Sequence, residues 1–301
     1  MRTFEFKQQM SFSPLIMACL ITVYIVWGST YVAIAFTLET MPPLLMTGAR
    51  FTVAGMFLII ILAIRGMKWP TGKQIRNCTI VGGSMLGFGV GGISVAQRTI
   101  SSGLASVGIA TVPIWAVLLA GLFLQQWPNK WEIAGISLGF IGIFLLNLQN
   151  GFGSNGIGAI IIVLAALFWA LGSVLSRFLD LPKGPVAYAF EMTLGGVFIT
   201  LVGLILGERF LQTPSTVSFL AWFYLVVGGS LFAYSAFMYL LQNVRTSVAT
   251  SYALVTPVVA ILLGVLLLSE TLDVYSFLAM ACVLLGVWSI FKGRDLKDSN
   301  S

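Results

Sequence analysis

The chain has 301 residues, of which 58% are hydrophobic and 9% are charged, with a formal net charge of +6 and a mean hydropathy of +0.99. A soluble globular domain cannot bury this much apolar surface, so the composition excludes that class and indicates an integral membrane protein. The basic residues follow a membrane topology, so the positive charge does not indicate a nucleic-acid partner.

Ten apolar segments have the length of about 20 residues that a helix needs to cross a hydrocarbon core of about 30 Å. The sequence therefore predicts an all-α membrane protein with ten transmembrane helices. Connections between the segments are short, which argues against an extramembrane domain. The predicted spans are 14–36, 43–64, 77–97, 102–124, 131–149, 156–177, 185–206, 218–240, 247–268 and 273–291.

The first segment follows Arg2 and Lys7 and so resembles a signal peptide. It is longer than a signal core and has no small-residue cleavage site after it, so we expect it to remain as the first helix. Tyr24, Trp27 and Tyr31 share one stripe of this helix and are predicted to face a cavity. The alternative is that they serve packing or interfacial anchoring.

Arg50 in the second segment and Glu191 in the seventh are the ionisable residues placed well inside predicted spans. Each carries an insertion cost of about 2.5–3.5 kcal/mol on translocon scales, which predicts a functional role. They are candidates for binding a charged or zwitterionic solute. Because the chain has no histidine, Glu191 is also the candidate carrier of a coupling proton. The alternatives are snorkelling, bonding to a backbone carbonyl, or a structural ion pair between the two.

Pro113 in the fourth segment and Pro257 in the ninth are predicted to interrupt their helices at equivalent points. Paired interruptions are typical of transporter binding sites and gates, and a rigid packing kink is the alternative. Glycines in the third and fifth segments favour close helix packing. Those of the fifth segment are also candidates for a homodimer contact; they are Gly135, Gly139 and Gly142.

The second half supplies further polar and aromatic candidates for the cavity wall. They are Trp169 and Ser173 in the sixth segment, Tyr234 in the eighth and Tyr252 in the ninth. Aromatic walls suit amphipathic small molecules through stacking and cation–π contacts, although aromatic residues at helical spacing are also typical of packing.

The chain contains an internal duplication. Residues 101–144 match residues 245–288 at a constant offset of 144, and the earlier parts match more weakly at 141–142, which aligns Arg50 with Glu191 and Gly55 with Gly196. This predicts a first five-helix repeat over 1–150 and a second over 151–301 within one membrane domain.

The distribution of basic residues predicts that both termini are cytoplasmic. With this orientation thirteen basic residues lie on the inner side and only Arg98 and Arg209 on the outer side, as the positive-inside rule requires. The two copies lie five spans apart. Because this number is odd, the second repeat is predicted to be inverted relative to the first.

Several short motifs resemble the EamA-type ten-helix family of the drug/metabolite transporter superfamily, across nearly the whole chain. They are Trp27-Gly28-Ser29-Thr30-Tyr31, Pro42-Pro43 with Arg50-Phe51, Ser102-Gly103-Leu104-Ala105 with Thr111-Val112-Pro113, Trp169 with Gly172-Ser173, Ala249-Thr250-Ser251-Tyr252 with Pro257, and Ser269-Glu270-Thr271-Leu272. The resemblance implies that helices three, four, eight and nine contribute strongly to a central cavity. It also implies export or exchange of amino acids and related small metabolites.

One position departs from this family pattern. The family commonly has a glutamate at the ends of both the fourth and ninth helices, whereas Gln126 stands here opposite Glu270. The departure argues against a symmetric pair of carboxylates. Glu270 is alternatively a helix cap or the partner of a basic side chain.

We therefore expect a multi-pass transporter of the bacterial inner membrane, with a small-molecule substrate, alternating access and no cofactor or metal. A lipid-linked carrier flippase or a multidrug exporter of the same fold is the alternative. An enzyme is disfavoured because the sequence offers no nucleophile with a nearby base: it has no histidine, and every lysine lies in a predicted loop or tail. The cysteines are three in number and widely spaced, which argues against disulfides and a zinc site.

Overall fold

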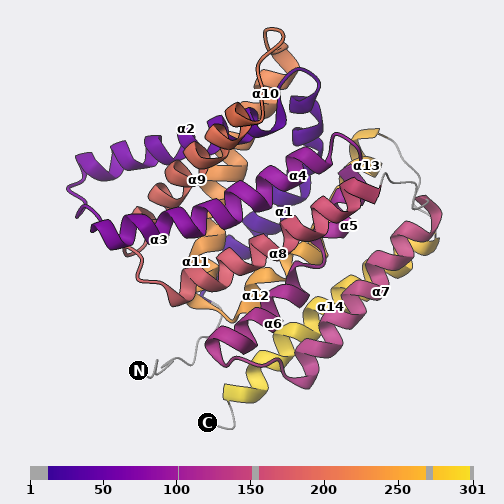
Figure 1. Ribbon diagram of the computed structural model, residues 1–301. Coiled ribbons are helices and arrows are strands. Elements are labelled where there is room, and N and C mark those ends of the chain that lie inside the picture. The colour runs from indigo at the N-terminus through magenta and orange to yellow at the C-terminus, as the bar shows by residue number, and fades with distance from the viewer. Residues whose placement is uncertain (1–12, 101, 151–155, 269–273, 299–301) are drawn as a thin grey trace.

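The computed structural model describes residues 13–100, 102–150, 156–268 and 274–298, and these residues form helices joined by short turns (Figure 1). The all-helical prediction is confirmed for them, and each of the ten predicted spans contains helix. Within the described ranges, six helical stretches are long and apolar enough to cross a membrane, and there are shorter apolar helices as well. The number of crossings and the side of the termini stay predictions.

The first half contains α1 (Pro14–Leu38), α2 (Pro43–Ile64), α3 (Gly72–Gly82) with η1 (Gly83–Val90) and α4 (Gly91–Ala96), α5 (Ser102–Ile109) with α6 (Val112–Leu124), and α7 (Lys130–Asn150). The second contains α8 (Gly156–Phe178), α9 (Pro185–Ile205), α10 (Thr216–Tyr224) with η2 (Leu225–Tyr234) and α11 (Ser235–Asn243), α12 (Thr246–Thr250) with α13 (Tyr252–Leu268), and α14 (Val274–Asp298).

Helix ends follow from local sequence. Ser13 caps α1 by accepting the Ile16 backbone N–H at 3.2 Å, as expected for serine at this position. Pro43 and Pro185 stand in the first turns of α2 and α9, where a missing N–H costs nothing. Glu208, in the loop after α9, accepts the Leu44 N–H of α2 at 2.9 Å. A loop of the second half therefore caps a helix of the first.

The third and eighth predicted spans each contain a π-helical segment, η1 and η2, near their middle. Such segments are rare and are frequent at functional sites, because the wider turn reorients side chains. Their occurrence at corresponding places in both halves was not predicted from the hydropathy pattern. It is a structural trace of the duplication.

The fourth and ninth spans are interrupted, but not at equivalent points as the prolines predicted. In the fourth span α5 ends at Ile109 and α6 begins at Val112, so Pro113 lies in the first turn of a new helix. In the ninth, the break falls at Ser251, and Pro257 lies inside α13. The prediction of equivalent breaks was wrong. Pro113 lies in a first turn, where a proline has no amide bond to lose, whereas Pro257 lies beyond the first turn of α13 and the helix continues through it.

Two helix pairs join the halves by close antiparallel packing. A Cβ atom on Gly55 of α2 would lie 2.7 Å from the Ala189 carbonyl oxygen of α9, and one on Gly196 of α9 would lie 2.8 Å from the Gly48 carbonyl oxygen of α2. At the offset of 141 residues, each of these contacts maps onto the other. α2 and α9 therefore pack as a pair related by an approximate two-fold axis.

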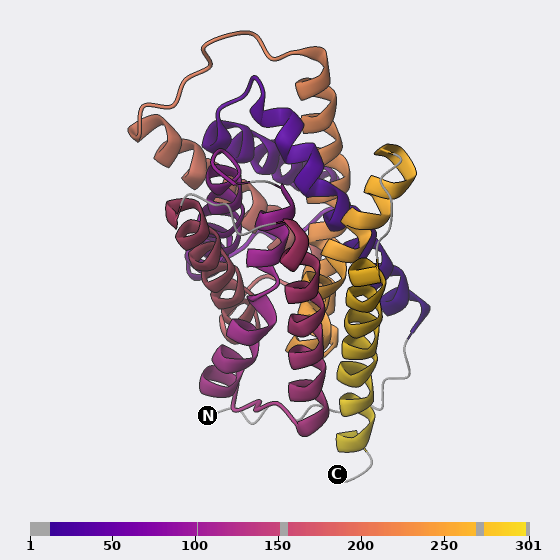
Figure 2. The same ribbon diagram turned by 90° about the vertical axis from the view of Figure 1, so that its right-hand side faces the viewer.

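The second pair, α7 and α14, lies side by side in both views (Figure 1, Figure 2). A Cβ atom on Gly135 would lie 3.0 Å from the Ile290 backbone nitrogen, and the Asn129 side chain donates to the Gly293 carbonyl oxygen at 2.5 Å. The structure thus uses Gly135 for packing within the chain, and the homodimer contact stays a prediction.

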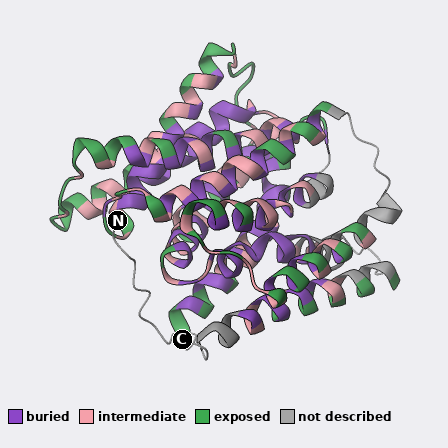
Figure 3. Ribbon diagram, turned by 60° about the horizontal axis from the view of Figure 1, so that its bottom comes forward, coloured by how far each residue is buried: buried purple, intermediate pink, exposed green. Residues whose placement is uncertain are grey.

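Burial follows the pattern of a membrane bundle. Buried residues fill the interior, while many exposed residues lie on outward faces and at the ends of helices (Figure 3). Large apolar side chains such as Ile60, Phe57 and Ile205 are exposed on these faces, where the lipid tails of a bilayer would cover them.

Candidate functional site

A cavity of about 50 Å³ lies between the two halves of the chain. Its wall includes six of the residues predicted from the sequence, namely Trp27, Tyr31, Arg50, Trp169, Tyr234 and Tyr252. The volume is enough for a few water molecules. Binding of an amino acid in it would therefore require helices or side chains to move apart.

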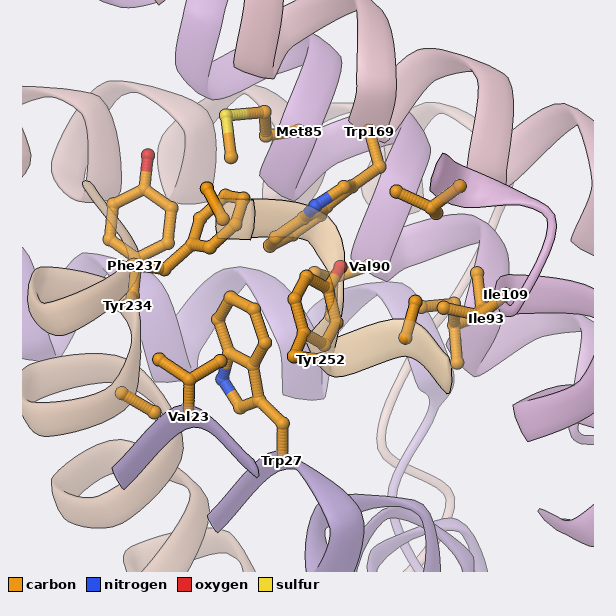
Figure 4. Close-up of a cluster of buried hydrophobic side chains, with 14 of the residues drawn as sticks. Val23, Trp27, Met85, Val90, Ile93, Ile109, Trp169, Tyr234, Phe237 and Tyr252 are labelled. Atoms are coloured by element: carbon orange, nitrogen blue, oxygen red, sulfur yellow. The ribbon is translucent and has the colours of Figure 1, made fainter. Parts of the chain in front are cut away.

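Aromatic rings from both halves pack together beside this cavity (Figure 4). The Trp27 ring centre lies 5.2 Å from that of Trp169 and 4.7 Å from that of Tyr252, both edge to face. Phe237 completes the group at 5.1 Å from Trp27 and 5.6 Å from Trp169. These separations are those that aromatic pairs prefer. Aromatic rings from both repeats therefore form one side of the cavity.

The two indole N–H groups of this aromatic group differ in their hydrogen bonding. Trp27 Nε1 donates to the Gly229 carbonyl oxygen at 3.2 Å. Trp169 Nε1 is buried and has no hydrogen-bond acceptor. Two tryptophans at corresponding positions of the repeats thus have different bonding.

Arg50 is buried, with only 3% of its surface exposed, and its guanidinium lies on the cavity wall. Its Nε donates to Ser230 Oγ of η2 at 2.8 Å, and its Cζ lies 4.6 Å from the centre of the Phe51 ring. Gly229 makes room for it, because a Cβ atom there would lie 2.8 Å from Nη2. Among the described residues, salt bridging joins Glu132 and Arg245 and does not involve Arg50.

Glu191 is fully buried on α9. Tyr234 Oη donates to its Oε2 at 2.9 Å, while its Oε1 has no hydrogen-bond partner. Tyr234 lines the cavity but Glu191 does not, so the carboxylate lies behind the tyrosine. Arg50 and Glu191 are thus both hydrogen-bonded to η2, through Ser230 and Tyr234, which lie four residues apart.

This geometry matches none of the three alternatives raised for the intramembrane charges. Arg50 and Glu191 do not form an ion pair with each other. Neither one snorkels to a surface, because both are buried. Their hydrogen bonds go to side chains of the eighth span rather than to backbone carbonyls.

Other predicted residues lie near the cavity but not on its wall. Tyr24 Oη and Ser251 Oγ are hydrogen-bonded at 2.7 Å. Ser173 Oγ donates to the Trp169 carbonyl oxygen at 2.7 Å. Pro113 lies in the first turn of α6, directly after the break in the fourth span, and Pro257 lies inside α13. Glu270 lies outside the described residues.

The family resemblance implied that the third, fourth, eighth and ninth helices contribute strongly to the cavity. Each of these does line it, but the first helix supplies more of the wall, through Trp27, Thr30, Tyr31 and Ile34. α2 adds Arg50, which is the only charged side chain on the described wall. The first two helices therefore contribute more to the cavity wall than the family resemblance implies.

A second polar cluster includes a buried residue that the sequence reasoning missed. Glu132, in the first turn of α7, is 1% exposed and forms a salt bridge with Arg245 Nε at 2.9 Å. Ser247 Oγ donates to its Oε1 at 2.5 Å, and the Asn129 N–H donates to its Oε2 at 2.9 Å. Gln126 lines a small cavity of about 10 Å³ beside it. The spacing of Asn129 and Glu132, typical of a capping box, was the available signal.

Comparison with known protein families identifies the family of the chain. The model of the EamA-like transporter family matches it twice, over residues 14–148 and 156–292. The chain therefore belongs to the EamA-like transporter family, with one copy of the domain in each half. With its apolar spans, it is a multi-pass protein of the bacterial inner membrane.

Two relatives illustrate the range of similarity. The chain is 40% identical to the uncharacterized inner membrane transporter YedA of Escherichia coli K12, over 92% of this chain and 90% of that one. It is 24% identical to the protein PagO of Salmonella typhimurium, over 91% and 92% of the two chains.

A solved structure, titled only as the crystal structure of a protein, has the same fold. It superposes with a TM-score of 0.77 at 22% identity and covers 93% of this chain and 98% of its own.

Proposed function

We propose that the chain is a secondary transporter that exports or exchanges amino acids or related small metabolites by alternating access through the central cavity. The observation that carries this proposal is a buried arginine on the wall of an aromatic cavity between two homologous halves, with no carboxylate partner among the described residues. A charge in that position is costly, and a solute that binds it would offset the cost.

The halves are, in this proposal, inverted repeats over residues 1–150 and 151–301. Antiparallel packing of α2 with α9 and of α7 with α14 supports the inversion. When a two-fold axis relates two equivalent helices that run antiparallel, the axis must be perpendicular to both helices. Such an axis lies in the plane of the membrane, which is the arrangement that supports alternating access.

The proposed topology assigns this conformation to a state closed toward the cytoplasm. Ile34 and Ile93, on the cavity wall, lie toward the predicted outer ends of their helices. On the opposite side Tyr24 is bonded to Ser251, and the Glu132–Arg245 cluster joins the two halves. Opening of these inner contacts would then expose the cavity to the cytoplasm, the side on which an exported solute enters it.

Proton coupling through Glu191 is part of the proposal. This carboxyl group is buried next to the cavity and has an oxygen without a partner. Tyr234 connects it to the cavity wall. A carboxyl group in this position can exchange a proton as the site changes its access, so that proton movement opposes solute movement.

Metabolite profiling of cells that lack or overproduce the protein, followed by counterflow in proteoliposomes, tests the function. We expect at least one profiled amino acid or related metabolite to show counterflow with the native chain. Arg50→Gln should reduce that counterflow at least tenfold in protein that inserts normally.

Absence of counterflow for every profiled solute would contradict the proposal. That result would instead favour a lipid-linked carrier flippase of the same fold. Counterflow of structurally unrelated drugs alone would instead favour a multidrug exporter.

A further inference from the structure

The two halves of the chain are joined at one end of the molecule by a buried carboxylate. Glu132 of α7 is 1% exposed, and both of its oxygens accept hydrogen bonds from the second half. Arg245 contacts it with Nε at 2.9 Å and with Nη2 at 3.0 Å, and Ser247 Oγ donates to it as well. Paired N–H donors give an arginine–carboxylate contact both strength and a fixed geometry. The contact therefore holds the start of α7 against α12.

Further hydrogen bonds extend this cluster to two more helices. Arg177 Nη1, near the end of α8, donates to Thr246 Oγ1 of α12 at 2.7 Å. On the other side, the Asn129 side chain donates to the Gly293 carbonyl oxygen of α14. These positions all lie at helix ends that the distribution of basic residues assigns to the cytoplasmic side. The predicted cytoplasmic ends of α7, α8, α12 and α14 are thus connected through one cluster.

The sequence lacks the same cluster at the predicted outer ends. At the offset of 144 residues, Glu132 corresponds to Ser276 and Arg245 corresponds to Ser101. A serine supplies neither charge of a salt bridge. Two inverted repeats with identical side chains would close equally well on either side of the membrane. A contact that only one side can form stabilises closure of that side by its own free energy.

We propose that the Glu132–Arg245 cluster is a one-sided latch, which holds the carrier closed toward the cytoplasm between transport cycles and sets how often its inner side opens. This inference rests on the proposed alternating access and adds a means of regulating it. Opening of the inner side separates α7 from α12, so the buried charge pair has to be broken, which is unfavourable. The latch lies outside the central cavity, so it acts on opening and not on binding.

The experiment measures opening of the inner side and needs no solute. In a full-length chain whose three native cysteines are replaced by alanine, Ser173→Cys places a thiol one turn beyond Trp169, toward the predicted cytoplasmic end of α8. Ser173 is fully buried, so a membrane-impermeant maleimide added to inverted vesicles reaches it only when the inner side opens. We expect Glu132→Gln to raise the labelling rate at least about fivefold, which corresponds to about 1 kcal/mol in the opening equilibrium.

Further variants identify the pair as the cause. Arg245→Gln removes the other partner and should raise the rate by a similar factor. The double variant should add little more, because the contact is already broken in each single variant. Arg98→Gln makes the same change at an exposed position in a different loop and should leave the rate unchanged. Independent, multiplying effects of Glu132→Gln and Arg245→Gln would overturn the inference.

A second reporter distinguishes opening from a general loss of packing. Ile34→Cys lies on the cavity wall toward the predicted outer end of α1 and is labelled from outside in right-side-out vesicles. Breaking a latch on the inner side should leave this outer rate unchanged or lower. Faster labelling of both reporters would mean that the fold has loosened, and it overturns the inference. Unchanged labelling of Ser173→Cys in Glu132→Gln overturns it as well.

The outcome is independent of the counterflow test. If no solute shows counterflow while the inner reporter responds as expected, the proposed function fails and the latch stands. If counterflow succeeds while the inner reporter does not respond, the transport function stands and the latch is wrong.

Discussion

Glu191 has two carboxyl oxygens in a fully buried position and a hydrogen bond to only one of them. Glutamine has nearly the same shape and can still accept the Tyr234 hydrogen bond, but it cannot exchange a proton. We expect Glu191→Gln to abolish proton-driven uptake into inverted membrane vesicles while solute exchange continues. Uptake of a solute identified by counterflow, with and without an imposed proton gradient, measures the difference.

A matched control is Glu39→Gln, because Glu39 is exposed at the end of α1. This variant should respond to the gradient as the native chain does. Proton dependence that survives in Glu191→Gln would rule out its role as the proton carrier.

The sequence was sufficient to single out Arg50 and Glu191, because a charge inside an apolar segment is visible without a structure. Their partners were not predictable. Ser230 and Tyr234 come from a span far away in the chain, and the choice among snorkelling, pairing and binding depends on which helix face meets which. Glu132 was missed because it lies at the start of a predicted span. A carboxylate in that position is expected to cap the helix, so the sequence does not indicate its contact with Arg245.

Among the helices, hydropathy predicted the ranges well because each span is apolar over the required length. Breaks within the spans were predicted poorly. The π-helical turns of η1 and η2 have no proline to mark them, and Pro257 lies six residues beyond the break at Ser251. Such breaks depend on tertiary contacts and on side chains that bond to nearby carbonyls, as Ser251 does to Val248.

The close contact between α2 and α9 gives a prediction about stability. Ala at position 196 would bring a Cβ atom to 2.5 Å from the Thr52 backbone nitrogen, so the two helices would have to separate. We expect Gly196→Ala to destabilise the protein by about 1–3 kcal/mol, as overpacking does. The melting temperature of the purified chain measures the effect. Gly72→Ala adds the same methyl group where nothing lies within 4 Å, and equal melting of both variants would contradict the prediction.

At the scale of the whole molecule, the salt bridge between Glu132 and Arg245 links the start of α7 in the first half with α12 in the second. Removing one partner leaves the other charge without its counterion. We expect Glu132→Gln and Arg245→Gln to destabilise the chain singly and to do so less than additively together. The expected coupling is about 1 kcal/mol, measured by reversible unfolding in mixed micelles.

Strictly additive effects in this cycle would mean that the contact does not hold the halves together. A parallel cycle with Arg98→Gln in place of Arg245→Gln provides the control, since Arg98 is exposed in a different loop.

Topology gives a further prediction at this scale. Thirteen of the basic residues were assigned to the inner side, so a reporter fused after Gly66 should be cytoplasmic and one fused after Gly153 should be external. Alkaline phosphatase and green fluorescent protein fusions measure the two sides. Both reporters on the same side would contradict the predicted orientation.

The mirrored glycine contacts of α2 and α9 have a consequence for movement. If the two repeats exchange conformations during transport, most contacts between them must be replaced by others. The contact of Gly55 with Ala189 would become that of Gly196 with Gly48, which is already present. This helix pair can therefore keep its packing while the surrounding helices rotate relative to it. The glycines of this pair would then set how freely the carrier turns over, even though none of them lines the cavity.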